Sequence, residues 1–278
     1  MKSYSHTAMD TKFTVSFGSN EAEALCASAA VACFARIDEV ERLLTKFSDT
    51  SDVAVVRAIQ SGGVAVVSHE MMDVLVASVK VCAATRGAFD PTVEARNFGE
   101  LILDVENFRV GVKNAPVALD FGGIAKGYAL DECAKILRSE QYELSDWLLD
   151  GGTSTLLASG SRAPGEEGWP IGVGGVWKDR TKRPTVVWLS GGALSGSGFE
   201  LRGEHVRDVR KGGAAVCWAQ SWSRADSAVV ADALSTAALS LDSREISCAC
   251  RDLGAKVLVA RRQGRFMDRF RDPLAVFG

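Results

Sequence analysis

The stretch LDFGGIAKGYALD, from Leu119 to Asp131, joins a short apolar segment to a glycine turn and the start of a helix. The pattern predicts a strand over Val117–Asp120 and a helix from about Ile124 to Arg138. Asp120 then lies beside a helix N-terminus, where free N–H groups and the helix dipole attract phosphate. Lys126 adds a cation in the first helical turn, although the spacing matches neither GxGxxG nor the P-loop. The stretch therefore predicts a phosphate-binding turn; an ordinary β–α turn with a solvated lysine is the alternative.

A second motif, ADALSTA, spans Ala231 to Ala237 within a predicted helix. Asp232 and Thr236 are four residues apart, so a carboxylate and a hydroxyl face the same side of the helix. The surrounding alanines leave room for a ligand on that side. Carboxylate and hydroxyl oxygens suit Mg²⁺ or Ca²⁺. The alternative is an alanine-rich packing helix in which the hydroxyl of Thr236 bonds a main-chain carbonyl.

Two further motifs are polar segments of lower specificity. LSGSG, Leu194 to Gly198, reads as a turn of small, hydroxyl-bearing residues and precedes His205. It contains no GxSxG elbow, so a hydrolase-type nucleophile is not supported. GAFDPTV, Gly87 to Val93, reads as a turn whose aromatic ring could contact a planar ligand. For His205, the alternative to a catalytic role is a structural one, since a lone histidine is more often structural than catalytic.

The rest of the chain alternates helical and strand-like patterns. A long helix over Glu21–Lys46 is expected to begin at an Asn20 cap. We expect an α+β fold: a single domain over residues 1–278 with mixed sheets and flanking helices, with two lobes as the open alternative. The other predicted helices are Glu70–Thr85, Ala228–Leu241 and Arg244–Leu253, and the other strands are Lys12–Phe17, Trp147–Leu149, Thr185–Leu189, Ala193–Leu194, Ala214–Trp222 and Lys256–Ala260.

Composition excludes several classes of function. The 278 residues carry a net charge of −3, which offers no basic footprint for nucleic acid. No apolar run approaches the roughly 20 residues of a membrane span, and no secretory signal is visible, so we expect a cytoplasmic protein. Seven scattered cysteines without a CxxC pair argue against a disulfide framework. With only three histidines, any metal is expected to be a hard cation held by oxygen.

Taken in order along the chain, these motifs resemble the ApbE family, the FAD:protein FMN transferases. The resemblance covers about residues 9–240, and the helix, strand and tail over 244–278 follow it. Members of that family bind FAD with Mg²⁺ and move the FMN half onto a Ser or Thr hydroxyl of a partner protein, releasing AMP. The resemblance rests on MDTKFTV (Met9–Val15), SDVAVV (Ser51–Val56), GAFDPTV, LDFGGIAKGYALD, DGGTS (Asp150–Ser154), WPIGV (Trp169–Val173), LSGSG, HVRDVRKG (His205–Gly212) and ADALSTA.

The resemblance also implies roles for particular residues. Asp232 and Thr236 would ligate Mg²⁺, with the carbonyl of Gly123 and Ser235 nearby. His205 would act close to the pyrophosphate, and either His205 or Asp232 would help to deprotonate the acceptor hydroxyl. The FAD site would be lined by Met9, Arg57, Ala88, Phe89, Asp90, Asp120, Lys126 and Val206.

The chain departs from the family pattern at several positions. Asp10 replaces the glycine of the opening Met-Gly-Thr, and Arg57 stands where an Asn or Tyr commonly tunes flavin handling. Gly196 interrupts the usual Ser-Thr-Ser-Gly, and Val209 replaces a proline after Asp208. These departures concern the flavin and acceptor side more than the metal pair. They leave two alternatives to protein flavinylation: an FAD pyrophosphatase, with water as the acceptor, and a non-catalytic FAD-binding protein.

Overall fold

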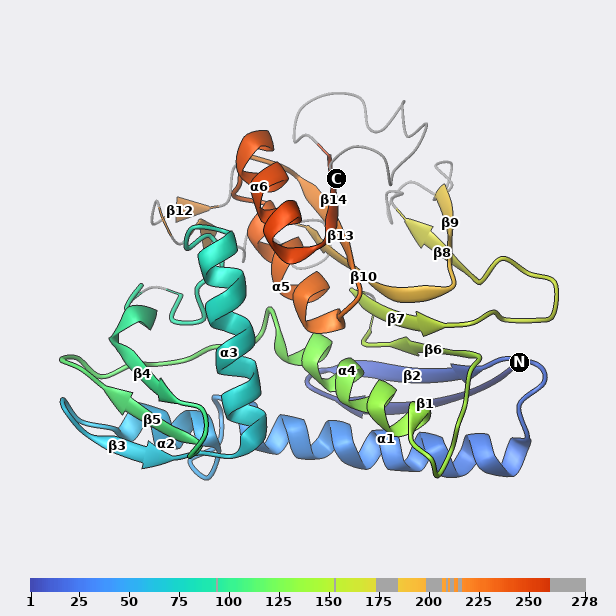
Figure 1. The fold of residues 1–278 in the computed structure, drawn as a ribbon, viewed down its shortest axis with the longest axis horizontal. Helices are drawn as coiled ribbons and strands as arrows, with labels where there is room; N and C mark the ends of the chain where they lie inside the picture. Colours follow the sequence, from blue (N-terminus) through green and yellow to red (C-terminus); the bar gives the residue numbers. More distant parts are fainter. Residues whose placement is uncertain are drawn as a thin grey trace.

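A seven-stranded antiparallel sheet forms the centre of the computed structural model (Figure 1). The structure describes residues 1–93, 95–152, 154–173, 185–198, 207–208, 210, 213–214 and 217–260. The N-terminal and the C-terminal strands lie at opposite edges of this sheet, and strands from the middle of the chain lie between them. In spatial order its strands are β1 (Lys2–Ala8), β2 (Thr11–Phe17), β6 (Trp147–Asp150), β7 (Thr155–Ser159), β10 (Gly191–Gly198), β13 (Gln220–Ala225) and β14 (Lys256–Ala260).

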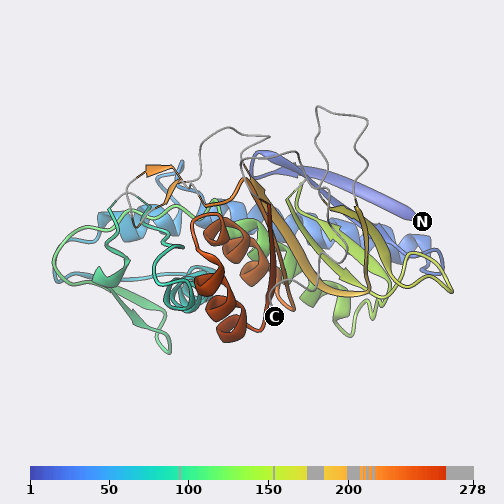
Figure 2. The same ribbon diagram turned by 90° about the horizontal axis from the view of Figure 1, so that it is seen from above.

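Three helices cover one face of this sheet and bury the main core against it. They are α1 (Glu23–Leu44), α4 (Ala125–Arg138) and α5 (Ala228–Ala238), and they pack in that order, α1 on α4 and α4 on α5. Helices α3 (His69–Ala84) and α6 (Ser243–Leu253) stand beside α5, and the short α2 (Asp52–Ala58) follows α1 (Figures 1 and 2). The expected α+β class, in which helices flank the sheets, is confirmed, and the described strand pairs are all antiparallel.

The opposite face of the sheet is covered by a hairpin of β8 (Trp169–Val173) and β9 (Thr185–Leu189). Side chains alternate between the two faces of a strand, so residues of β7 and β10 contribute to two different clusters. The hairpin cluster is separate from the main core and consists of Ala158, Trp169, Ile171, Val173, Val187, Leu189 and Leu194.

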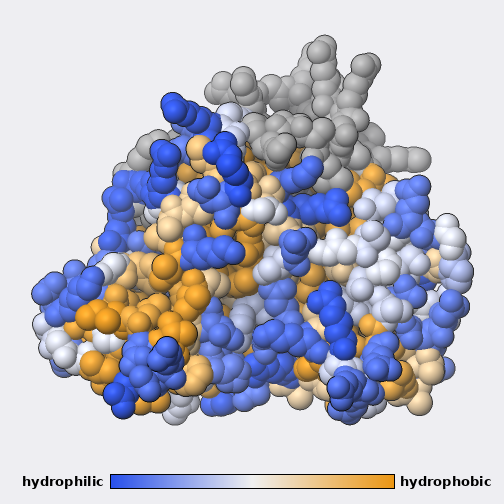
Figure 3. All heavy atoms as spheres, in the orientation of Figure 1, coloured by the Kyte–Doolittle hydropathy of each residue, from blue (hydrophilic) through white to orange (hydrophobic). Residues whose placement is uncertain are grey.

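A second, smaller sheet lies beside α3 and contains β3 (Val64–Val66), β5 (Arg109–Val112) and β4 (Leu101–Asp104), the last preceded by a 3₁₀ turn over Phe98–Glu100. Exposed apolar side chains on its outer face include Val64, Val66 and Ile102. Figure 3 shows apolar surface in the region where Figure 1 places this sheet. A two-stranded hairpin, β11 (Arg207–Asp208) and β12 (Gly213–Ala214), completes the strands of the described chain.

An ion network joins three helices behind the sheet. Arg36 of α1 lies between Glu70 of α3 and Glu132 of α4, with distances of 2.6 Å from Nη1 to Glu70 Oε1 and 3.0 Å from Nε to Glu132 Oε2. Both carboxylates are more than nine-tenths buried. Burial raises the pKa of each, but hydrogen bonds from Arg36, and at Glu132 also from Lys135, outweigh it and lower the pKa of both. The network fixes α4 relative to α1 and α3.

Most predicted elements are present, and four predictions are wrong. Val117–Asp120 is not a strand: the backbone N–H of Asp120 donates to the carbonyl of Pro91 at 2.7 Å instead of pairing with a neighbouring strand. Helix α1 begins after Ala22 without a side-chain cap, so Asn20 is not its N-cap. LSGSG belongs to strand β10 rather than to a turn. The predicted strand Ala214–Trp222 divides between β12 and β13. No helix of the described chain is both long and apolar enough to cross a membrane.

Candidate active site

The carboxylate of Asp232 lies where α4, α5 and the central sheet meet. Asp232 is 4% exposed. Its Oδ2 accepts a hydrogen bond from the backbone N–H of Gly127 at 3.1 Å, and its Oδ1 lies 3.0 Å from the hydroxyl of Thr155 and 3.4 Å from that of Ser195. Among the described residues no cationic side chain pairs with this carboxylate. A buried carboxylate is normally paired with a cation or bound to a metal, so we expect a cation to bind at Asp232.

Helix α4 reaches Asp232 because Gly127 has no side chain. A Cβ at this position would lie 2.3 Å from the carbonyl oxygen of Ala228 and 2.8 Å from the Cα of Val229. One turn further along the same face of α4, the Asp131 carboxylate accepts hydrogen bonds from the N–H groups of Ala228 and Val229, at 2.8 and 2.9 Å. The two helices therefore meet at the first turn of α5, through direct backbone contact and a carboxylate cap.

The glycine turn before α4 contacts the other predicted metal ligand. A Cβ on Gly123 would lie 3.3 Å from the hydroxyl of Thr236, which places the turn directly against α5. The Thr236 hydroxyl is also 3.3 Å from the carbonyl of Asp232, which is the packing arrangement considered as the alternative. Ser235 is fully buried, and its hydroxyl donates to the same carbonyl at 2.9 Å. The four predicted metal ligands, Gly123, Asp232, Ser235 and Thr236, are therefore neighbours.

The donor set is one carboxylate with several hydroxyls and main-chain oxygens. Where the structure describes the chain, no three His, Cys, Asp or Glu side chains come together as a metal cluster. Mg²⁺ needs only one or two protein carboxylates, because it retains water and substrate oxygens as ligands. The residues present fit a magnesium ion bound jointly by protein and substrate.

On the exposed side of the turn, Lys46 pairs with Asp120 and Lys126 bonds the glycine turn itself. Asp120 Oδ1 accepts from the N–H of Gly122 at 2.9 Å, and its Oδ2 is 2.7 Å from the ammonium of Lys46. Lys126 bonds the carbonyl of Gly122 at 3.1 Å. The ammonium groups of Lys46 and Lys126 are thus held beside two glycines and a helix N-terminus, and a helix N-terminus with nearby cations favours phosphate groups.

The GAFDPTV turn, which follows α3, adjoins the group formed by Lys46, Asp120, Gly122, Gly123 and Lys126, called the phosphate cradle below. Ala88 and Phe89 are buried, and the ring of Phe89 lies 3.7 Å from the position of a Cβ on Gly123. Asp90 closes its own turn, since its Oδ1 accepts from the N–H and the hydroxyl of Thr92 at 2.8 and 2.6 Å. The bond between Asp120 N and the Pro91 carbonyl holds this turn beside the glycine turn.

The remaining predicted residues are less closely tied to this centre. Met9 occupies the β1–β2 turn with a positive φ of 51° and packs against the main core. Arg57 lies on α2, where its guanidinium is 3.0 Å from Asp49. His205 and Val206 fall outside the described residues, as does the departure at Val209.

Sequence reasoning missed several residues of the site. Lys46 and Phe47 follow α1, and Phe47 is 88% exposed beside the Lys46 ammonium, 5.2 Å from its ring centroid. In the sequence, the only signal for these two residues is an aromatic residue, Phe47, within a polar segment. Thr155 follows the DGGTS motif directly, and Ser195 belongs to LSGSG, but neither motif indicates that their hydroxyls meet Asp232. Gly127 lies within the quoted LDFGGIAKGYALD, yet its close contact with α5 is visible only in three dimensions.

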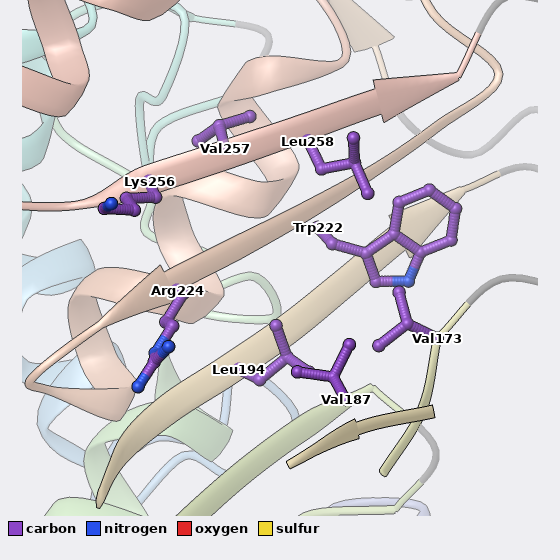
Figure 4. A pocket seen from close by; sticks show the side chains of 8 residues that line it. All are labelled: Val173, Val187, Leu194, Trp222, Arg224, Lys256, Val257 and Leu258. Carbon is purple, nitrogen blue, oxygen red and sulfur yellow. The ribbon is translucent and has the colours of Figure 1, made fainter. Parts of the chain in front are cut away.

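A separate apolar pocket lies on the other face of the same strands (Figure 4). Ser195 faces α5, so its neighbour Leu194 faces the β8–β9 hairpin. Gly196 shares this outer face, where a Cβ would lie 3.0 Å from the ring of Trp222. The family departure at Gly196 is therefore packed against an indole and does not face Asp232. The pocket is lined by Val173, Val187, Leu194, Trp222, Arg224, Lys256, Val257 and Leu258.

Comparison with known proteins agrees with the motif order. The model of the ApbE family matches the chain over residues 9–97 and 94–259. No curated protein sequence matched the chain.

Solved structures with a similar fold cover almost the whole chain. The ApbE protein from Thermotoga maritima superposes with a TM-score of 0.79 at 24% identity, covering 93% of each chain. Apo Pseudomonas stutzeri flavinyl transferase ApbE gives 0.81 at 24% identity, covering 95% of this chain and 91% of that one. Flavin transferase ApbE from Vibrio cholerae gives 0.80 at 17% identity, covering 93% and 92%. At these identities the likeness establishes a shared fold.

Proposed function

The chain belongs to the ApbE family, and on that premise we propose that it is a flavin transferase that moves the FMN half of FAD onto a Ser or Thr hydroxyl of a target protein and releases AMP. Two similar structures carry the names flavinyl transferase and flavin transferase. The observation that carries the proposal is Asp232, a buried carboxylate without a cationic partner among the described residues, next to a glycine turn with two lysines.

The reaction requires positioning and neutralisation of charge more than covalent help from the protein. The acceptor hydroxyl oxygen attacks the phosphorus of the FMN half, a new P–O bond forms, and the P–O bond to AMP breaks. The hydroxyl proton passes to a base, for which Asp232 and His205 are the candidates, and AMP leaves with the bridging oxygen. Lys126 and the N–H groups at the start of α4 would hold the diphosphate in place.

A magnesium ion would be held by Asp232, Thr236, Ser235 and the carbonyl of Gly123. It would supply Lewis-acid stabilisation of the charge that develops on the phosphoryl oxygens. The flavin would lie against the turns that carry Phe89, Asp90 and Met9. Phe47 offers a further exposed ring on the same side as Lys46 and Asp120.

The test is a transfer assay with purified protein, FAD, Mg²⁺ and an acceptor protein that carries a Ser/Thr flavinylation motif. We expect a fluorescent, covalently flavinylated acceptor and one AMP per label. Asp232→Ala is expected to abolish Mg²⁺-dependent AMP release, whereas Asp252→Ala, an exposed carboxylate on α6, is the matched control and keeps full activity. Undiminished turnover in Asp232→Ala would refute the metal assignment.

The same assay separates the alternatives. FMN and AMP without a labelled acceptor would identify an FAD pyrophosphatase. FAD retained by the purified protein without AMP release would identify a flavin-binding protein without transferase activity. The family departures at Arg57 and Val209 motivate both tests, whereas Gly196 lies on the outer face against Trp222, away from Asp232.

A further inference from the structure

Two hydroxyl groups lie beneath Asp232 on neighbouring strands. Thr155 opens β7 and Ser195 lies in β10, and the two are cross-strand partners. Both are fully buried, and their hydroxyl oxygens are 2.9 Å apart. Hydroxyls on the helix-facing side of a central sheet are unusual, because that side normally carries apolar residues. At Thr155 a valine would fill nearly the same space, so packing alone does not require the hydroxyl.

Both hydroxyls point to the same carboxylate oxygen. Thr155 Oγ1 is 3.0 Å and Ser195 Oγ is 3.4 Å from Asp232 Oδ1, while the N–H of Gly127 is 3.1 Å from Oδ2. Hydrogen bonds to an ionised oxygen are stronger than those between neutral groups. Donors on both oxygens fix the rotation of the carboxylate about its Cβ–Cγ bond, and they keep it in place while no cation is bound.

The hydroxyls also continue toward the other proposed ligands. Ser195 Oγ is 3.2 Å from Ser235 Oγ, which is 2.8 Å from Ser197 Oγ, and Ser197 Oγ is 3.4 Å from Thr236 Oγ1. The chain of hydroxyls thus connects Asp232 with Ser235 and Thr236 along the sheet. Groups that orient metal ligands in this way typically change metal affinity when they are removed.

We propose that Thr155 and Ser195 are positioning residues that orient the Asp232 carboxylate for Mg²⁺ binding. This inference rests on the proposed function, since it presupposes that Asp232 is a magnesium ligand. Neither residue is assigned contact with the reacting atoms. Their effect passes through Asp232.

The sheet provides a matched control. Ser223 of β13 is the cross-strand partner of Ser195 on its other side and is equally buried. Its hydroxyl has no hydrogen-bond partner in the part of the chain that is described. Ser195→Ala and Ser223→Ala therefore remove the same atom from the same depth of the same sheet, and only one of them removes a contact with Asp232.

The experiment is a Mg²⁺ titration by isothermal titration calorimetry on the full-length protein, with and without FAD. Thr155→Val is expected to weaken Mg²⁺ binding about 10–100-fold, the range typical of groups that orient metal ligands. Thr155→Ser, which retains the hydroxyl, is expected to restore most of the affinity, and Ser223→Ala to bind as the wild type does. In AMP-release kinetics, Thr155→Val should raise the Mg²⁺ concentration for half-maximal rate more than it lowers the rate at saturating Mg²⁺.

The outcomes separate this inference from the proposed function. A wild-type protein that does not bind Mg²⁺ in either titration would refute the metal assignment, and the positioning roles with it. A wild type that binds Mg²⁺ and a folded Thr155→Val that binds equally well would refute the positioning role alone. If Thr155→Val does not fold, Ser195→Ala decides the question against Ser223→Ala. Loss of fold in both Thr155→Val and Ser195→Ala would make the hydroxyls structural and overturn the proposal.

Discussion

Replacing Gly127 with alanine tests whether the site depends on direct contact between α4 and α5. The added Cβ would meet the Ala228 carbonyl oxygen at 2.3 Å and its carbonyl carbon at 2.6 Å. Because these are backbone atoms, no side-chain rotation relieves the contact. The helices must separate by up to about an ångström to reach an ordinary contact distance. That displacement stretches the 3.1 Å hydrogen bond from Gly127 N to Asp232.

Two effects lower the stability of Gly127→Ala, and a third partly offsets them. Overpacking a well-packed contact costs about 1–3 kcal/mol. A hydrogen bond to a charged group contributes about 1.5–3 kcal/mol, and its loss adds to the cost. Alanine is the better helix former by about 1 kcal/mol, which offsets part of it. We therefore expect Gly127→Ala to lower the free energy of unfolding by about 2–5 kcal/mol, or the melting temperature by about 5–15 °C.

Urea unfolding followed by circular dichroism measures this change. Gly99→Ala is the matched control, because no atom lies within 4 Å of its added Cβ, and we expect a change below about 0.5 kcal/mol. Mg²⁺ binding by Gly127→Ala should also weaken, since the donor to Asp232 Oδ2 moves. A Gly127→Ala protein as stable as the control, with unchanged Mg²⁺ affinity, would show that the two helices do not need this contact.

Three other predictions follow from the ion network and the lysines. Arg36→Met leaves two buried carboxylates without their shared cation and should cost about 3–5 kcal/mol in urea unfolding; a loss below 1 kcal/mol would contradict it. The folded-state pKa values of Glu70 and Glu132 are lowered, so their contribution is present above the unfolded value of 4.5 and is lost as pH falls through the folded values. Stability should therefore fall more steeply below pH 4.5 in the wild type than in Arg36→Met, and parallel acid titrations would argue against this origin. Lys126→Met should raise the Kd for FAD about 10–100-fold in a flavin fluorescence titration, whereas Lys256→Met on the outer face should not; equal effects would count against the cradle.

Local patterns were sufficient where a segment is governed by its own sequence. The predicted helices Glu70–Thr85, Ala228–Leu241 and Arg244–Leu253 match α3, α5 and α6 to within a few residues, and ADALSTA correctly placed Asp232 beside Thr236 on one helix. The antiparallel sheet was harder, because β1 pairs with β2 only after a two-residue turn at Met9 and Asp10, both with positive φ and neither a glycine. Nothing in SYSHTA indicates a strand without its partner.

Contacts between distant parts of the chain were beyond a single sequence. The ion pair of Lys46 with Asp120 joins residues 74 positions apart, and Thr155 and Asp232 are 77 apart. Small residues favour turns, so the sequence of LSGSG predicts a turn. In β10 the serine hydroxyls of this segment lie on one face of the strand, and the absence of a side chain at Gly196 leaves space for the Trp222 ring on the other face. Tertiary packing therefore decides what these residues do.

The two faces of β10 have a practical meaning for anyone who engineers this protein. Odd-numbered residues such as Ser195 and Ser197 lie against α5, whereas Leu194 and Gly196 face the β8–β9 hairpin. Lys256 is exposed on this outer face, so a spectroscopic label or an altered charge at Lys256 lies on the opposite side of the sheet from Asp232. A reporter placed there leaves every side chain around Asp232 unchanged.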